Sequence, residues 1–161
     1  MSSWHRWKPR ACWGEAAIRL VFMWSKRGSI DYTLSKRATL NALFKGSSHA
    51  SDACDADPYL LRAAKFHGEP SGRKCPICRS KELMEIRYTF GDQLGQYSGR
   101  IKSTDELIEM QNEYGQFRVY IVEVFRNCHW NHLHLSYLLG DGQERRPPRK
   151  VRTLEDEDWV S

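Results

Sequence analysis

The stretch Cys75-Pro76-Ile77-Cys78 places two thiols three residues apart, and a third thiol follows in Phe125-Arg126-Asn127-Cys128-His129-Trp130-Asn131-His132. Two thiolates at this spacing chelate one ion when the backbone turns tightly between them, and amide N–H groups of the turn can hydrogen-bond the sulfurs. Zinc takes four ligands in a tetrahedron, so a second segment has to complete the site. The pattern is typical of a zinc ribbon, in which two hairpin turns hold one ion.

The second turn lacks one cysteine, because Phe125 stands where a Cys-x-x-Cys pair would begin. Three thiols remain for one ion: Cys75, Cys78 and Cys128. We expect His129 to be the fourth ligand, with His132 and Cys54 as alternatives. Such a closed zinc site is structural, because no coordination position is left for water. The competing interpretation is that the metal has been lost and the cysteines are vestigial.

Helical signals dominate the part of the chain that precedes the first cysteine pair. Three helical pieces are predicted: residues 30–44, a short turn at 51–54 and residues 58–67. The apolar face of the first contains Ile30, Leu34, Ala38 and Leu40. Ser29 is its expected N-cap, while Asp57 followed by Pro58 begins the last helix. Residues 69–72, rich in proline, serine and glycine, are predicted to be a linker.

The pattern changes to β structure after this linker. Three strands are predicted: residues 84–90, residues 117–125 and residues 132–140. The second of these is apolar on both faces around Glu123, which is typical of a central strand. A capping box from Ser103 to Glu106 predicts a helix between the first two strands.

These signals predict an α+β protein with a short N-terminal helical bundle followed by a zinc-ribbon-like antiparallel sheet with one inserted helix. Four segments are expected: a peripheral N-terminal extension at 1–27, a helical segment at 28–70, a zinc-ribbon-like β domain at 71–140 and a disordered tail at 141–161.

The formal net charge of +5 is confined to the N-terminal extension. Residues 1–27 contain six Lys and Arg against one Glu, whereas residues 28–161 contain 19 residues of each sign. A pI near 9 therefore does not indicate a basic nucleic-acid-binding face on the folded part. The tryptophans and basic residues of segment 1–27 are compatible with an amphipathic helix on a membrane or a partner, and the simpler interpretation is that this segment is peripheral.

Cysteine usage and hydropathy favour the cytoplasm. The chain has five cysteines, an odd number, and its most apolar stretch at 16–24 lacks the features of a signal peptide. No run approaches the roughly 20 apolar residues of a membrane span. A reducing compartment makes metal binding a better use of the thiols than a disulfide framework.

The chain resembles an uncharacterised actinobacterial family of small proteins with a domain of unknown function, over about residues 28–140. The motifs that carry the resemblance are at residues 54–68, 75–78, 90–91, 122–124 and 130–133. The resemblance implies a zinc ribbon with a helical preface, and relatives with a full second Cys-x-x-Cys where this chain has Phe125. The resemblance implies that such relatives have four cysteine ligands in addition to His132, so His132 is not needed as a ligand there. This favours His129 as the residue that replaces the missing cysteine here. It implies no known activity.

The expected function is that of a non-catalytic binding module with structural zinc, docking on RNA polymerase, the ribosome or RNA itself. A protein–protein adaptor at the inner membrane face, using residues 1–22, is the first alternative. A thiol redox protein is the second, although Cys75 and Cys78 lack the strand–helix context of such enzymes. No small-molecule substrate site is evident, so we expect no enzyme activity. The sequence does not specify the partner or the oligomeric state.

Two further predictions concern single side chains. The residues of a predicted binding surface lie just after the third thiol: Trp130, Asn131, His132 and His134. An exposed aromatic and polar patch of this kind can stack on a base or dock a peptide, and the alternative is that Trp130 buries against the cysteine turns. Glu123, a carboxylate in an apolar strand, is expected to pair with Arg118 or Arg87.

Overall fold

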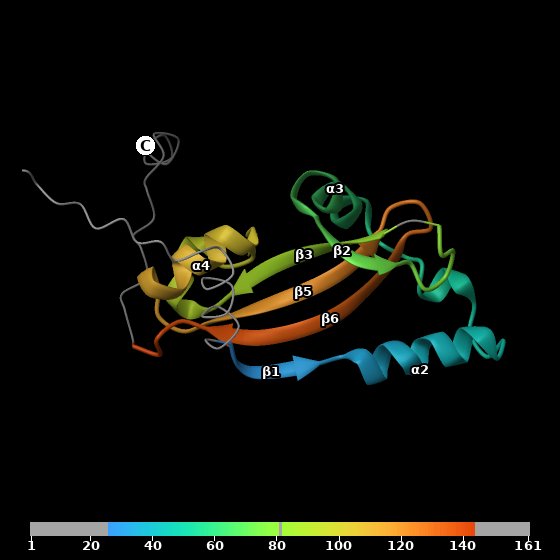
Figure 1. Ribbon diagram of the computed structural model, residues 1–161, viewed down its shortest axis with the longest axis horizontal. Coiled ribbons are helices and arrows are strands. Elements are labelled where there is room, and N and C mark those ends of the chain that lie inside the picture. Colours follow the sequence, from blue (N-terminus) through green and yellow to red (C-terminus); the bar gives the residue numbers. More distant parts are fainter. Residues whose placement is uncertain (1–25, 81, 144–161) are drawn as a thin grey trace, which may run out of the picture.

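The computed structural model describes residues 26–80 and 82–143, which form helices and one antiparallel sheet (Figure 1). The elements in chain order are β1 (Arg27–Asp31), α2 (Thr33–Phe44), the 3-10 turn η1 (Ala50–Asp52), α3 (Pro58–His67), β2 (Glu69–Lys74), β3 (Glu82–Phe90), the 3-10 segment η2 (Asp92–Tyr97), β4 (Arg100–Ile101), α4 (Thr104–Glu113), β5 (Phe117–Phe125) and β6 (Trp130–Leu139).

The sheet has the strand order β1-β6-β5-β3-β2, and β4 pairs with the end of β3. Every pairing is antiparallel. The apolar strand β5 lies in the middle, as its sequence predicts, with long ladders to β3 and β6. The predicted α+β class is confirmed, and the helix predicted from the capping box is α4.

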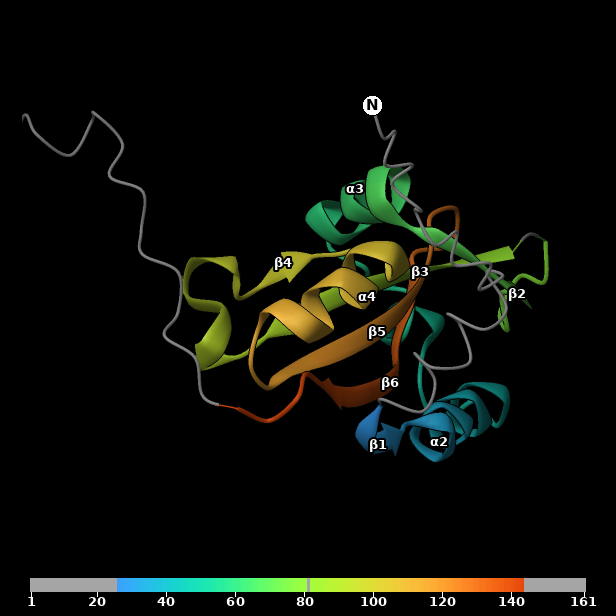
Figure 2. The ribbon, with the colours of Figure 1, turned by 60° about the vertical axis from the view of Figure 1, so that its left-hand side comes forward.

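Alternation along β5 separates two apolar layers on opposite faces of the sheet. On one face, α4 contributes Leu107 and Met110 to a core that includes Phe117, Val119, Ile121, Tyr137 and Leu139. On the other face, α3 contributes Ala63 and Ala64 to a core that includes Ile86 and Val124. Figure 2 shows α4 in front of the sheet and α3 behind its upper end.

The two predicted helix starts differ in outcome because only one has a side-chain cap. Asp57 accepts a hydrogen bond from the Tyr59 amide at 2.7 Å, so α3 begins at Pro58 as predicted. The first helix begins at Thr33, not at Ile30, and has no side-chain cap. Its predicted apolar face is wrong in part: Leu34 is 77% exposed, whereas the predicted member Leu40 does pack against a core. Leu40 and Leu43 are the α2 residues that pack against a core.

Strands β1 and β2 occupy segments that were predicted to be a helix start and a linker. Ile30 pairs with Ser136 of β6, and Pro70 pairs with Met84 of β3. Neither segment has strong strand propensity, and both ladders contain irregularities. They form strands because β6 and β3 present unpaired backbone groups that need partners. The same sheet therefore contains residues from the predicted segments 28–70 and 71–140.

Within residues 26–80 and 82–143, no helix is long and apolar enough to cross a membrane. The predictions for most of the N-terminal extension and for the tail after Gln143 fall on residues outside this description.

Candidate metal centre

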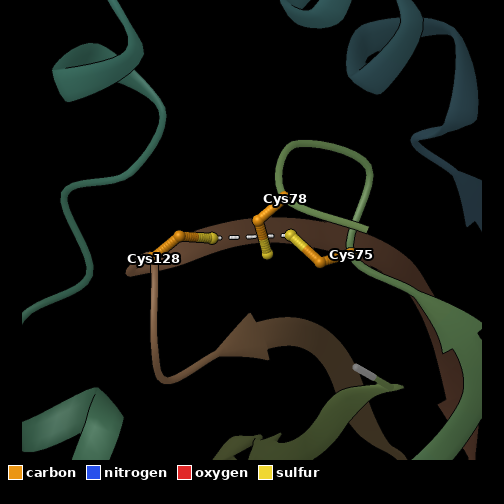
Figure 3. Close-up of side chains that lie close together, drawn as sticks. All are labelled: Cys75, Cys78 and Cys128. Carbon is orange, nitrogen blue, oxygen red and sulfur yellow. Dashed lines mark hydrogen bonds between the residues drawn. The ribbon is translucent and has the colours of Figure 1, made fainter. Parts of the chain in front are cut away.

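Three cysteine sulfurs converge at one end of the sheet. The Sγ atoms of Cys75, Cys78 and Cys128 all lie within 4.8 Å of one another, and Figure 3 shows the three side chains pointing toward a common point. The distance between the Cys75 and Cys128 sulfurs is 3.5 Å. Two thiolates bound to one tetrahedral zinc ion at about 2.3 Å lie about 3.8 Å apart, which is near the Cys75–Cys128 distance. The three sulfurs together could hold a metal ion.

Strand pairing brings these distant segments together. Cys75 and Cys78 lie in the turn between β2 and β3, and Cys128 lies in the turn between β5 and β6. Because β3 and β5 are neighbours with Met84 opposite Val124, both turns emerge at the same end of the sheet.

In each turn, the residue that follows a cysteine has a left-handed backbone conformation. Arg79 and His129 follow Cys78 and Cys128, and they have positive φ angles of 53° and 61°. Among the residues that the structure describes, these two are the non-glycine residues with a positive φ angle. Such a residue folds the chain back, so that the next amide can point at the preceding sulfur. The two turns are thus alike although only one contains a full Cys-x-x-Cys.

Backbone amides and burial set the acidity of the three thiols. Burial raises the pKa of Cys75 to about 11, against hydrogen bonds from the amides of Cys78 and Ile77. Burial also raises the pKa of Cys128, and a hydrogen bond from the Trp130 amide opposes it. For Cys78, burial raises the pKa, but hydrogen bonds from the side chain and amide of Ser80 and from the Cys75 and Cys128 thiols together lower it to about 7. One thiol is therefore poised to ionise near neutral pH.

The predicted fourth ligands occupy different positions around the three sulfurs. The ring nitrogens of His129 are not among the ligand atoms within 4.8 Å, and the residue is exposed. The His132 ring stacks on Trp130, with centroids 5.9 Å apart and an interplanar angle of 9°. The Cys54 sulfur is also outside the group of ligand atoms within 4.8 Å, but Cys54 is half-buried and packs against the same apolar cluster as Cys75 and Cys128.

That cluster supports the turns from within the protein. Its buried members are Ala53, Cys75, Leu83, Phe125 and Trp130. Trp130 has 0% exposure and packs with Cys75, so the alternative in which it buries against the cysteine turns is confirmed. Its assignment to an exposed binding surface is wrong, because a core indole cannot stack on a base. Phe125 is also buried, so the residue at the expected cysteine position packs in the core. Asn131, His132 and His134 are partly buried.

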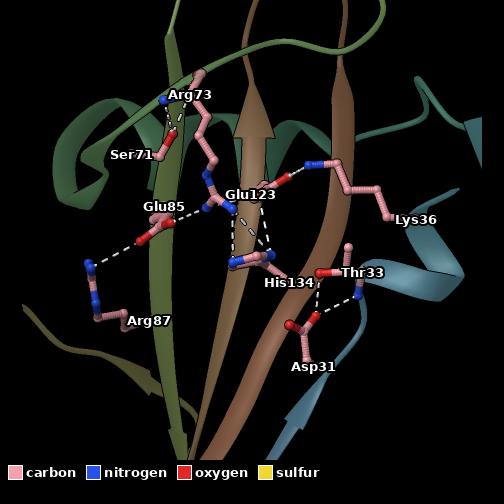
Figure 4. Close-up of polar contacts among 9 residues, drawn as sticks. All are labelled: Asp31, Thr33, Lys36, Ser71, Arg73, Glu85, Arg87, Glu123 and His134. Atoms are coloured by element: carbon pink, nitrogen blue, oxygen red, sulfur yellow. Dashed lines mark hydrogen bonds and ion pairs between the residues drawn. The ribbon is translucent and has the colours of Figure 1, made fainter. Parts of the chain in front are cut away.

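A second polar cluster surrounds Glu123, in the middle of the sheet (Figure 4). The carboxylate is completely buried and forms ion pairs with Lys36 and with Arg73, the latter at 2.9 Å. The Nδ1 atom of His134 lies 3.5 Å from Oε1 of Glu123, and Arg73 also contacts Glu85. The sequence predicted an ion pair here, but with the wrong partners.

Lys36 and Arg73 were missed because Lys36 lies in a helix assigned to an N-terminal bundle and Arg73 directly follows the predicted linker 69–72. Only the docking of α2 and β2 on the sheet places them beside Glu123. Arg87, one of the predicted partners, instead pairs with Glu69 at 3.0 Å and with Glu85 at 3.1 Å.

An apolar groove that sequence reasoning also missed lies beside α3, where this helix leaves part of the sheet uncovered. The residues that line the groove are Tyr88, Phe90, Tyr120, Val122, Asn131 and Leu133, and its volume is about 650 Å³. Phe90 is 45% exposed and meets Tyr120 edge to face, with centroids 5.6 Å apart. The alternation of residues 84–90 could have predicted this groove. The apolar residues of that strand continue past the part of the sheet that α3 covers.

Comparison with known proteins places the chain among relatives. A model described as a family of unknown function (DUF5318) matches residues 23–153. "Uncharacterized protein Rv0049" of Mycobacterium tuberculosis (strain ATCC 25618 / H37Rv) is 48% identical over 120 residues, which cover 74% of this chain and 88% of that protein. "Uncharacterized protein Mb0050" of Mycobacterium bovis has the same identity and coverage. No solved structure matches the chain. The expected membership is confirmed: the chain belongs to this family of unknown function.

Proposed function

We propose that the protein is a non-catalytic binding module in which a structural zinc ion joins the two hairpin turns. The observation that carries this proposal is the convergence of the Cys75, Cys78 and Cys128 sulfurs from segments about 50 residues apart. Three thiolates favour zinc over the hard cations, which prefer oxygen ligands. The similar backbone of the two turns supports the same conclusion, because amide hydrogen bonds stabilise thiolates that bind a metal.

The zinc is structural in this proposal because it is held by cysteines at the edge of an apolar core. Cys75 is almost completely buried beside Trp130 and Leu83. Metal binding would stabilise the packing of both hairpin ends on that core. Four reduced thiols among the described residues suit the cytoplasm, where we place the protein.

We further propose that the module docks on a protein surface of a larger assembly, of the kind that RNA polymerase or the ribosome offers. The apolar groove supports this proposal because none of its lining residues is charged. Exposed aromatic side chains are typical anchors of protein interfaces. Residues 28–161 have no net charge, which favours a protein partner over direct phosphate contacts.

Native mass spectrometry before and after chelation tests the metal. We expect one zinc per chain, lost on chelation, and a Cys128→Ser variant with at least tenfold weaker binding. A Cys12→Ser variant is the matched control, since it makes the same substitution at a cysteine that the proposed site does not use. A wild-type protein purified from zinc-supplemented medium without bound zinc would contradict the proposal.

Affinity capture from cells that express the chain tests the docking. The double variant Phe90→Ser/Tyr120→Ser should lose the partner, whereas Phe66→Ser should keep it, because Phe66 is equally apolar and 67% exposed but lies outside the groove. Capture should persist in high salt and after nuclease treatment. Loss of capture under either condition would identify nucleic acid as the direct ligand and overturn the protein-docking proposal.

A further inference from the structure

We propose that Cys54 is the fourth ligand, which makes the site a four-cysteine centre assembled from three segments of the chain. This inference rests on the proposed zinc function and completes its ligand set. The third segment is the loop between η1 and α3, which carries Cys54 next to the buried Ala53.

The position of Cys54 supports this assignment. Its side chain packs against the apolar cluster that contains Cys75, together with Cys128 and Ile77. Ala53, immediately before it, is 6% exposed and belongs to the buried part of that cluster. Cys54 is therefore held on the side of the sheet where the other three sulfurs meet.

Two hydrogen bonds tie the Cys54 loop to the turn that carries Cys128. The Ala56 amide donates to the backbone carbonyl of His129 at 3.0 Å. The side-chain amide of Asn131 donates to Oδ1 of Asp55 at 2.8 Å. Both contacts involve residues that closely follow Cys54 and Cys128 in the sequence, so they hold the Cys54 loop beside the turn that carries Cys128.

Four cysteine side chains gathered at one end of the sheet would repel one another as thiolates. A divalent cation relieves repulsion of this kind.

Each histidine has a different role in the structure. His129 is exposed, and its backbone carbonyl accepts a hydrogen bond from the Ala56 amide. Its main chain, and not its side chain, therefore makes the contact with the Cys54 loop. His132 is stacked on Trp130, and the charged groups near it are Lys36, Glu123 and His134. It therefore belongs to the buried polar cluster around Glu123.

Cobalt substitution tests the ligand set, because the intensity of the thiolate-to-cobalt charge-transfer band rises with the number of bound thiolates. We expect Cys54→Ser to lose about a quarter of the band and to bind zinc at least tenfold more weakly. The matched variants His129→Ala and His132→Ala should keep the full band. An unchanged band in Cys54→Ser, or a loss in either histidine variant, would overturn the assignment.

Alkylation of the full-length wild-type protein gives a second measurement that does not depend on a variant folding. With zinc bound, peptide mapping should show protection of Cys54, Cys75, Cys78 and Cys128. The same protein after chelation of the zinc serves as the reference for reagent activity. Rapid modification of Cys54 in a protein that holds one zinc would overturn this inference alone, whereas absence of zinc would overturn the proposed function as well.

Discussion

His129 is strained at the residue scale, because its left-handed backbone disfavours any side chain with a Cβ atom. The φ angle of 61° lies in the region that glycine adopts without penalty. The turn keeps this geometry because it directs the Trp130 amide toward the Cys128 sulfur. In the proposed four-cysteine site, this position contributes its backbone conformation and not its imidazole.

Replacing His129 by glycine should leave zinc binding intact and raise the free energy of unfolding by up to about 1 kcal/mol, because glycine removes the strain. Chemical denaturation of the zinc-loaded protein measures the change. His129→Ala is the matched control: it removes the ring but keeps the strain, so its stability should stay near that of the wild type. Loss of the metal in both variants would restore His129 as a ligand.

Cys78 and Cys75 should react at different pH values in the metal-free protein. Cys78 has a pKa of about 7, so it is mostly a thiolate above that pH and mostly protonated below it. Cys75, with a pKa of about 11, stays protonated through neutral pH. Iodoacetamide labelling followed by peptide mapping should show a rise at Cys78 with a midpoint near pH 7. Equal labelling of both thiols at pH 7 would contradict this difference.

Helix α3 illustrates the element scale, because its start depends on one short hydrogen bond. The Asp57 carboxylate accepts the Tyr59 amide at 2.7 Å, and Pro58 occupies the first helical position, where no amide donor is needed. The helix then packs Ala63 and Ala64 on β3 and β5. Its N-terminus also follows directly on the loop that holds Cys54.

Asp57→Ala should lower the free energy of unfolding by about 1 kcal/mol, since the amide at the helix start loses its acceptor. Asp57→Ser keeps an acceptor and should lie within a few tenths of a kcal/mol of the wild type. Urea denaturation monitored by circular dichroism distinguishes the two variants. Equal stability of all three proteins would show that the cap contributes nothing.

Glu123 connects elements across the whole molecule. Its carboxylate, on β5, contacts Lys36 from α2, Arg73 from β2 and His134 from β6. Both basic partners come from segments whose attachment to the sheet the sequence did not predict. The buried charge therefore helps to select how α2 and β2 dock.

Glu123→Gln should lower the free energy of unfolding by about 3 kcal/mol, because it leaves basic side chains without their buried counter-charge. The partly exposed Arg73 can turn to water and limit the loss. Glu113→Gln, on the exposed side of α4, is the control and should change stability by less than about 0.5 kcal/mol. Thermal and urea denaturation at the same pH provide the measurement, and equal values for the two variants would remove the role assigned to Glu123.

Local chemistry in the chain was enough to predict the caps of α3 and α4, the central strand β5 and the three thiols that meet. Each of these depends on neighbouring residues or on a short periodic pattern. Strands β1 and β2, the burial of Trp130, the partners of Glu123 and the approach of Cys54 depend on which distant segments the sheet brings together. Such contacts satisfy backbone and charged groups contributed by other elements, so no local pattern in these segments records them.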